Sequence, residues 1–207
     1  MKRMLSVVVA MLTVAGALSA AEPRVVFEDR FEGKLGEGWS WLRENPQNWR
    51  IQQGALEIRV EPGVNTTVKN ALRRKAPDRS KGKFAAEVTV TFTTPPTKQF
   101  EQVGLTLYQN DVPGPKLVHE RIDGKTYIIP GKIPTETKTV QLRLVLAKDR
   151  LIFQFRPDGK GEFKTVETRP LPAAANEQIS IQCYNGPADA EHWMRFGDFR
   201  VAELADY

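Results

Sequence analysis

The sequence predicts an all-β protein, built as a two-sheet antiparallel β-sandwich. Apolar and polar residues alternate with a period of two from Trp49 to the end of the chain, and helical periodicity is nearly absent from that region. The alternating runs are short, and the gaps between them carry turn sequences such as Asp123-Gly124 and Asp158-Gly159. Short turns between many strands indicate that neighbouring strands run antiparallel.

The alternation also places each strand and its core-facing side. The expected strands are 49–52, 55–60, 66–73, 83–92, 101–109, 116–121, 139–147, 150–156, 162–167, 178–185 and 194–203. One parity of each strand is apolar and is expected to face the core. The residues that this rule turns inward include Val88, Val90, Phe92, Val103, Leu105, Leu107, Leu142, Leu144, Leu146, Ile179 and Ile181. The opposite parity carries Gln102, Thr106, Tyr108, Arg143, Ser180, Gln182 and Tyr184. These side chains form one polar and aromatic surface if their strands are neighbours in one sheet.

The first residues have the pattern of an export signal. Lys2 and Arg3 precede an apolar run that closes on small residues at Ala21. The run is shorter than the roughly 20 residues that a membrane-spanning helix needs. We therefore expect residues 1–21 to be a signal peptide and 22–207 to be one secreted or periplasmic domain that does not insert in the membrane.

Charge and cysteine content limit the partners and the chemistry. Without Lys2 and Arg3 the chain holds 28 basic residues (30 minus 2) against 25 acidic ones, a net charge of +3. This balance, with no aromatic residues interleaved in the basic stretch 69–83, argues against a nucleic-acid partner. That stretch is either a site for an acidic glycan or a solvated strand end and loop. Cys183 is the only cysteine and shares its parity with Ile181, so we expect a buried structural thiol.

Several segments, taken in order, resemble a known family. They are Phe27-Glu-Asp-Arg-Phe31, the tryptophan-rich segment 39–51, Gln102-Val-Gly-Leu-Thr-Leu-Tyr108, Val140-Gln-Leu-Arg-Leu144 and Phe153-Gln-Phe-Arg-Pro-Asp-Gly159. The set is similar to the concanavalin A-like lectin/glucanase superfamily, and within it to the β-sandwich appended to family 43 glycosidases and its free-standing relatives. The resemblance implies a jelly roll with a concave face, a fold that serves both sugar-binding modules and enzymes.

Catalytic motifs are missing from the sequence. Enzymes of this superfamily that cleave β-glucans carry Glu-x-Asp-x-x-Glu on one strand, and the family 43 arrangement adds a catalytic propeller; this sequence contains neither. Glu101 and Glu120 remain as possible acids, and His119 and His192 are the only histidines. The first hypothesis is therefore a carbohydrate-binding module without a catalytic site.

Two alternatives stay open. One is a glycoside hydrolase or lyase in which Tyr108 and His119 act as acid and base with Glu120, and Arg143 neutralises a uronate carboxylate. The other is a structural or protein-interaction domain, with the stretch 69–83 and a tryptophan pair, Trp39 and Trp41, as its contact surface.

The candidate ligand-binding residues are chosen because sugar faces stack on aromatic rings and sugar hydroxyls bond with amide, carboxylate and guanidinium groups. The expected set is Gln102, Tyr108, His119, Glu120, Arg143, Gln182, Tyr184 and Trp193. For His119 and the aromatic residues, a packing role is the alternative.

Calcium is the one cofactor that the resemblance implies. The first and last strands meet in many jelly rolls of this superfamily, where carboxylates and carbonyls can enclose the ion. Glu28, Asp29 and Asp198 are the expected ligands, supplemented by carbonyls or water because calcium takes six to eight oxygens. The alternative is that these acids pair with Arg30 or Arg200.

Overall fold

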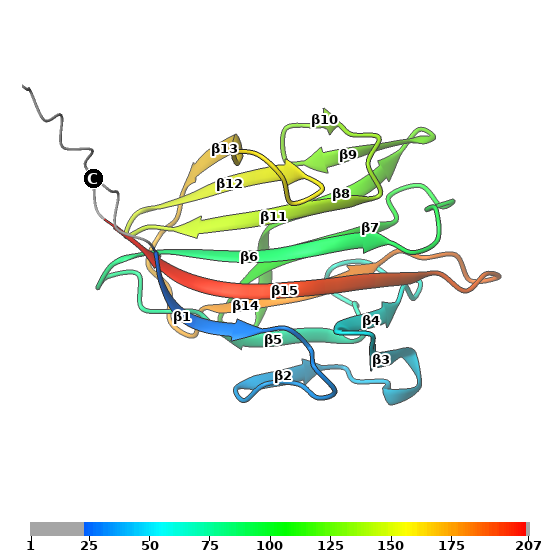
Figure 1. The fold of residues 1–207 in the computed structure, drawn as a ribbon, viewed down its shortest axis with the longest axis horizontal. Coiled ribbons are helices and arrows are strands. Elements are labelled where there is room, and N and C mark those ends of the chain that lie inside the picture. The colour runs from blue at the N-terminus through cyan, green and yellow to red at the C-terminus, as the bar shows by residue number, and fades with distance from the viewer. Residues whose placement is uncertain (1–22, 206–207) are drawn as a thin grey trace, which may run out of the picture.

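Strands form nearly all of the regular structure in the computed structural model, which describes residues 23–205 (Figure 1). The first sheet has the order β13 (Lys164–Pro170), β12 (Arg150–Pro157), β11 (Thr139–Leu146), β6 (Lys83–Phe92), β15 (Trp193–Leu204), β4 (Ala55–Arg59) and β3 (Trp49–Gln52), and β1 (Arg24–Asp29) also pairs with β15. The second sheet has the order β10 (Ile133–Pro134), β9 (Lys125–Ile129), β8 (Val112–Ile122), β7 (Gln102–Gln109), β14 (Gln178–Tyr184), β5 (Ala71–Lys75) and β2 (Trp39–Leu42). The strand pairs of both sheets are antiparallel.

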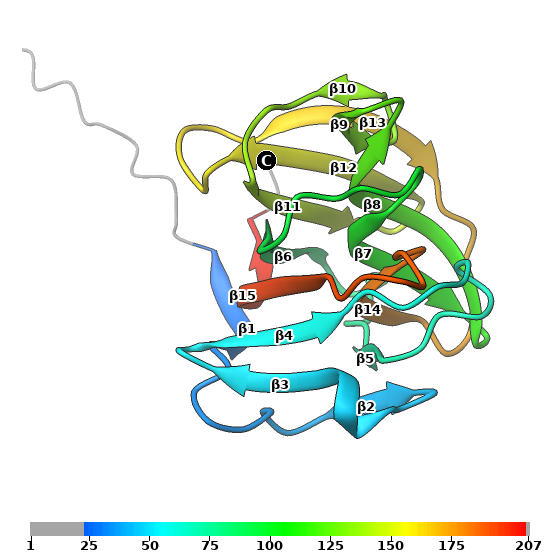
Figure 2. The same cartoon turned by 90° about the vertical axis from the view of Figure 1, so that its right-hand side faces the viewer.

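The two sheets pack face to face and bury one core between them (Figure 2). The residues predicted to face inward are all buried, for example Val90 of β6, Leu105 of β7 and Ile181 of β14. Strand alternation therefore identified the core correctly, and the predicted β-sandwich is confirmed. Cys183 is buried as expected, and burial raises the pKa of its thiol well above the usual range.

The predicted strand at 66–73 is displaced. Residues 64–67 form a turn in which the Thr67 amide donates to the Val64 carbonyl and the Thr67 hydroxyl accepts from the Val64 amide at 3.0 Å. Asn70 then adopts a φ of 52°, and the strand begins only at Ala71. A threonine side chain that bonds its own turn competes with the sheet ladder, which explains the shift.

Two further observations concern the ends of the chain and the membrane. The predicted signal at 1–21 lies outside the described residues. Within 23–205, no helix is long and apolar enough to cross a bilayer; the regular helical structure there is a 3₁₀ turn at η1 (Pro46–Asn48), capped by the Asn45 side chain.

Candidate functional site

The outward face of the second sheet carries a continuous polar surface, which we call the polar face. One row crosses five strands, where Lys116, Thr106, Ser180, Arg73 and Ser40 are direct partners in turn. A second row joins Glu120, Gln102 and Tyr184, and Tyr108 and Gln182 lie on the same side of β7 and β14. Direct cross-strand partners have Cβ atoms about 4.5–5.5 Å apart, so these side chains touch or bond.

Hydrogen bonds hold much of the polar face in one arrangement. The Tyr108 hydroxyl donates to Gln182 Oε1 at 3.0 Å, and the Ser180 hydroxyl donates to the same oxygen at 3.0 Å. Lys116 Nζ donates to Gln102 Oε1 at 2.6 Å, and Gln102 Nε2 donates to Glu120 Oε1 at 2.9 Å. The network therefore orients both glutamine amides before any ligand arrives.

Four polar atoms of this face have no partner among the described residues. They are Thr106 Oγ1, Gln182 Nε2, Arg73 Nε and, on the same parity of β14, Gln178 Oε1, and each is buried. Gln182 and Thr106 are each about 1% exposed. Buried polar groups nearly always find a partner in protein, water or ligand, so these atoms mark a place where other polar groups belong.

The pKa values of ionisable groups on the polar face are shifted in opposite directions. Burial lowers the pKa of Lys116, and the nearby Glu120 carboxylate opposes this change. Burial raises the pKa of Glu120, opposed by Lys116. The pKa values of Tyr108 and Tyr184 are also raised, chiefly by burial. Clustered perturbed groups are typical of functional sites.

The aromatic rings of the polar face are covered. Arg73 lies over the Tyr108 ring at 5.3 Å from the centroid, and Lys116 lies over the Tyr184 ring at 5.7 Å. Val68, from the segment between β4 and β5, packs with Tyr184 and Leu42 in a small separate cluster. Parity thus placed both tyrosines on the correct side, but the expectation that their rings are exposed for stacking is wrong.

His119 is not on the polar face. It pairs with Val103 and therefore points into the core, where its ring lies 4.3 Å from the Phe92 ring. Neither ring nitrogen has a partner among the described residues, and burial lowers the pKa of His119 to about 3. His119 is therefore a neutral packing residue, because burial of a charged imidazole there costs too much free energy.

Arg143 and Trp193 lie on the outward face of the other sheet. Arg143 of β11 donates to Glu87 Oε1 at 2.8 Å and stacks on Phe163 at 3.5 Å. Trp193 of β15 lies under the Arg50 guanidinium at 4.1 Å. The expectation that Arg143 shares a surface with Tyr108 is wrong, because β11 pairs with β6 and β12 in the first sheet.

On the outward face of the first sheet, two buried glutamates each bond two arginines. Buried Glu57 accepts from Arg50 at 2.8 Å and from Arg195 at 3.2 Å. Buried Glu87 accepts from Arg143 and, at 3.0 Å, from Arg200. Each acid is shared by two arginines, so this face has a structural role in the described chain.

Comparison with known proteins agrees with this architecture. Residues 28–175 match the model of the β-xylosidase C-terminal concanavalin A-like domain. The chain belongs to that family. The resemblance predicted from sequence is therefore confirmed, and the chain is a β-sandwich of the kind associated with family 43 glycosidases. No curated protein matches the chain.

Solved structures with the same fold include a GH43 protein, a xylosidase and an alginate lyase. The GH43 protein BlXynB from Bacillus licheniformis is 19% identical with a TM-score of 0.66, over 86% of this chain and 39% of that one. A xylan β-1,4-xylosidase from Bacillus halodurans is 16% identical with a TM-score of 0.65, over 92% and 41%. An alginate lyase from Klebsiella pneumoniae is 11% identical with a TM-score of 0.59, over 86% and 99%. The chain thus spans about two fifths of the length of the first two proteins, and at these identities the likeness shows the fold alone.

In this family member the three expected calcium ligands do not come together as one set. Asp29 Oδ1 accepts from the Phe31 amide at 2.8 Å, and Oδ2 accepts from the Gly36 amide at 2.7 Å and from Trp39 Nε1 at 2.8 Å. Glu28 alternates to the other side of β1, where it pairs with Arg30. Glu28 and Asp198 line one hollow together, but Arg30, Arg156 and Arg200 line it too, and Asp29 does not. No three acidic, histidine or cysteine side chains in residues 23–205 are placed to hold a metal. The donor set does not fit calcium; Asp29 instead closes the loop after β1, and the expected pairing of β1 with β15 is observed.

Glu101 and His192 form a buried pair that the sequence did not reveal as such. Glu101 Oε1 lies 2.7 Å from His192 Nδ1, and Glu101 Oε2 accepts from the amides of Thr97 and Lys98. The pair ties the segment before β7 to the segment before β15. Both side chains are buried, so Glu101, one of the two possible acids, is not a surface carboxylate.

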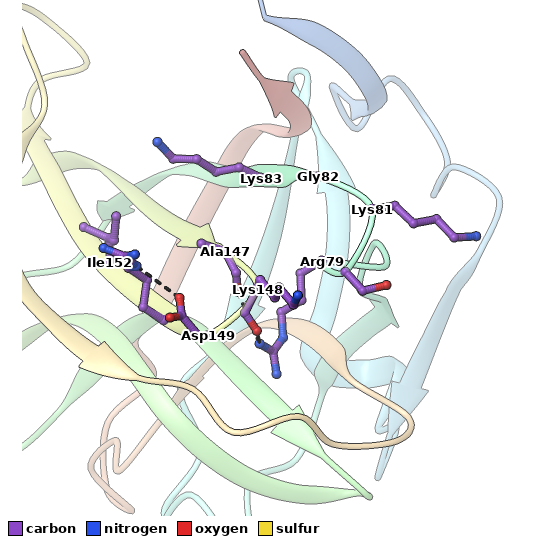
Figure 3. Close-up of a pocket in the computed structure, with 10 residues that line it drawn as sticks. Arg79, Lys81, Gly82, Lys83, Ala147, Lys148, Asp149 and Ile152 are labelled. Atoms are coloured by element: carbon purple, nitrogen blue, oxygen red, sulfur yellow. Dashed lines mark hydrogen bonds and ion pairs between the residues drawn. The ribbon is translucent and has the colours of Figure 1, made fainter. Parts of the chain in front are cut away.

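The basic stretch 69–83 is split between structural and exposed residues. A hollow of about 510 Å³ at the end of the sandwich is lined by Arg79, Lys81, Lys83 and the turn at 147–150 (Figure 3). Arg79 Nε and Nη2 bond Glu177 at 2.9 Å, and its other bonds go to the carbonyls of Ala147, Lys148, Leu171 and Pro172. Lys81 and Lys83 point away from each other in Figure 3. The two lysines therefore do not converge on one ligand, and Arg79 is a structural anchor. Trp39 and Trp41 pack against the core, which weakens the protein-contact hypothesis for the same surface.

Proposed function

We propose that this chain is an exported carbohydrate-binding module that holds its ligand on the polar face. The carrying observation is the set of unpartnered buried atoms beside an ordered network: Thr106 Oγ1, Gln182 Nε2 and Arg73 Nε. A saccharide offers many hydroxyls, each both donor and acceptor, and can satisfy such atoms together. Membership of a glycosidase-associated family and an export-like start of the sequence support the proposal.

Binding here depends on hydrogen bonds more than on ring stacking. The rings of Tyr108 and Tyr184 are already covered by Arg73 and Lys116. The polar atoms between them are preorganised, which reduces the entropy lost on binding.

The residues expected for a catalytic role do not lie together on one surface. Of the four residues expected for a lyase or hydrolase, only Tyr108 and Glu120 are on the polar face. His119 is in the core and Arg143 belongs to the other sheet. General acid–base chemistry needs its groups within hydrogen-bond reach of one substrate, so the binding role is better supported.

Thr106→Val tests the proposal with little change of shape. The variant should weaken binding of a glycan found on an array by about 5- to 10-fold, through loss of one hydrogen bond. Thr91→Val is the matched control, because the Thr91 hydroxyl is bonded to Thr139 on the other sheet at 2.9 Å. It should leave the affinity unchanged. An array of neutral and acidic polysaccharides without any binding, or equal loss in both variants, contradicts the proposal. Cell fractionation of the full chain tests the export.

A further inference from the structure

We propose that the ligand of the polar face is an acidic saccharide, whose carboxylate binds the guanidinium of Arg73 while Lys116 supplies a second positive charge. The inference rests on the proposed function and names its substrate class. Arg73 was not among the expected ligand-binding residues, but it lies in the basic stretch 69–83, for which an acidic glycan was one of the two interpretations. It sits on the outward parity of β5, opposite Ser180.

Arg73 has an unused binding edge. Its Nη1 donates to Asp111 Oδ1 at 2.9 Å, while Nε is buried without a partner among the described residues. An arginine binds a carboxylate best through two parallel N–H bonds, and the edge that includes Nε remains for a second carboxylate. Asp111 is 74% exposed at the β7–β8 turn whereas the Arg73 side chain is 12% exposed, so solvent screens this ion pair from the side of Asp111.

Four arginines on the outward face of the first sheet do not offer such a free edge. Arg143 and Arg200 share the carboxylate of Glu87, and Arg50 and Arg195 share that of Glu57. A ligand carboxylate at any of these four competes with a buried acid of the protein. Among these outward-facing arginines, the free edge of Arg73 is therefore distinguished by its missing partner and not by local charge density. Nη1 of Arg74 also lacks a partner in the described part of the chain, but Arg74 has the opposite parity on β5.

Lys116 lies in the same row as Arg73, across Thr106 and Ser180, and its charge is not paired by a direct bond to a carboxylate of residues 23–205. Its Nζ bonds the neutral Gln102 amide at 2.6 Å and approaches the Tyr184 hydroxyl at 3.4 Å. Burial lowers its pKa, although Glu120 lies near. An anionic ligand over the row compensates this desolvated charge, and the row between the cations supplies Thr106 and Ser180 for neutral hydroxyls.

Matched polymers separate carboxylate recognition from general sugar binding. Polygalacturonate and alginate, each beside its carboxyl-reduced form, are titrated calorimetrically into the full chain at about 0.15 M ionic strength, where long-range surface charge effects are screened. We expect at least one acidic polymer to bind about tenfold or more tightly than its reduced form, because only the acidic form makes the charge-assisted bonds.

Three variants on or near β5 assign the effect. Arg73→Gln should remove the preference for the acidic form, and Arg73→Lys should restore little of it, because lysine lacks the planar fork. Lys75→Gln removes an exposed cation from the same strand and should change affinity less than about twofold. Asp111→Asn, at an exposed position, should strengthen acidic binding about two- to threefold by removing the competing carboxylate; this variant serves if Arg73→Gln does not fold.

Each outcome has a distinct meaning. No binding of any polymer overturns the proposed function and the inference with it. Equal binding of acidic and reduced forms, or of wild type and Asp111→Asn, overturns the inference alone. Equal weakening by Lys75→Gln and Arg73→Gln shows unspecific charge attraction and also overturns it.

Discussion

Replacement of His119 by leucine should remove a large part of the acid sensitivity of the fold. His119 is fully buried against Phe92, with both ring nitrogens unpartnered among the described residues. Its pKa in the folded chain is about 3, against 6.5 for a solvated histidine. The unfolded chain therefore takes up a proton on His119 as the pH falls below 6.5, while the folded chain does not.

The sign and size of the effect follow from proton linkage. The folded state binds fewer protons, so stability is unaffected above the unfolded pKa and falls as the pH drops from 6.5 towards 3. One pKa unit corresponds to about 1.4 kcal/mol, so the loss is about 2 kcal/mol at pH 5 and approaches about 5 kcal/mol below the folded pKa. At pH 7 the leucine variant should be equal to or more stable than wild type, because it removes two unsatisfied buried atoms.

Urea unfolding of wild type and His119→Leu at several pH values between about 7 and 4 measures the difference. The other ionisable groups are common to both proteins, so their contribution cancels in the difference. The variant should gain about 3 kcal/mol relative to wild type over this range. A difference in unfolding free energy that does not change with pH would show that the folded chain protonates His119 as readily as the unfolded chain, and would refute the reasoning.

Three further predictions concern single side chains. Arg79→Leu should cost about 3–5 kcal/mol in urea unfolding, because Glu177 and several carbonyls lose their partner, and a cost below about 1 kcal/mol would contradict the anchoring role. Asp29→Asn should cost about 1–3 kcal/mol by weakening the bonds to the loop after β1, equally with calcium or with chelator; a chelator-dependent melting temperature in wild type would show a calcium site instead. Tyr184→Phe should weaken ligand binding about 3- to 10-fold through the hydroxyl near Lys116 with little effect on melting, whereas Tyr184→Ala should destabilise the domain by about 3 kcal/mol or more, because the ring is buried.

Much of the fold was predictable because strong alternation reports local burial. Expected strands 83–92 and 139–147 are observed at Lys83–Phe92 and Thr139–Leu146. Strand β1 was not among the strands read from alternation, since both Val25 and Val26 are exposed and the run has no buried parity. Its pairing with β15 came only from the resemblance.

The candidate site was partly predictable, and the failures have separate causes. Gln102, Tyr108, Gln182 and Tyr184 come together because β7 and β14 are neighbours. The predicted surface for Arg143 was wrong because the sheet to which a strand belongs depends on long-range pairing, and alternation carries no information about that pairing. The position of His119 was readable, since it shares its parity with the apolar Leu117 in β8.

The two outward faces differ in how completely their polar groups are satisfied, and this difference can be measured as a trade between stability and binding. On the first sheet the Thr91 hydroxyl bonds Thr139, so Thr91→Val should cost about 0.5–1.5 kcal/mol of unfolding free energy. On the polar face Thr106 Oγ1 is buried without a partner, so Thr106→Val should leave the ligand-free domain equally stable or stabilise it by up to about 2 kcal/mol. The same change should reduce the thermal shift that a saturating glycan produces, because ligand stabilisation scales with affinity. If Thr106→Val destabilised the free domain as much as Thr91→Val does, the Thr106 hydroxyl would already have a hydrogen-bond partner without ligand. The assignment of the binding site to the polar face would then be refuted.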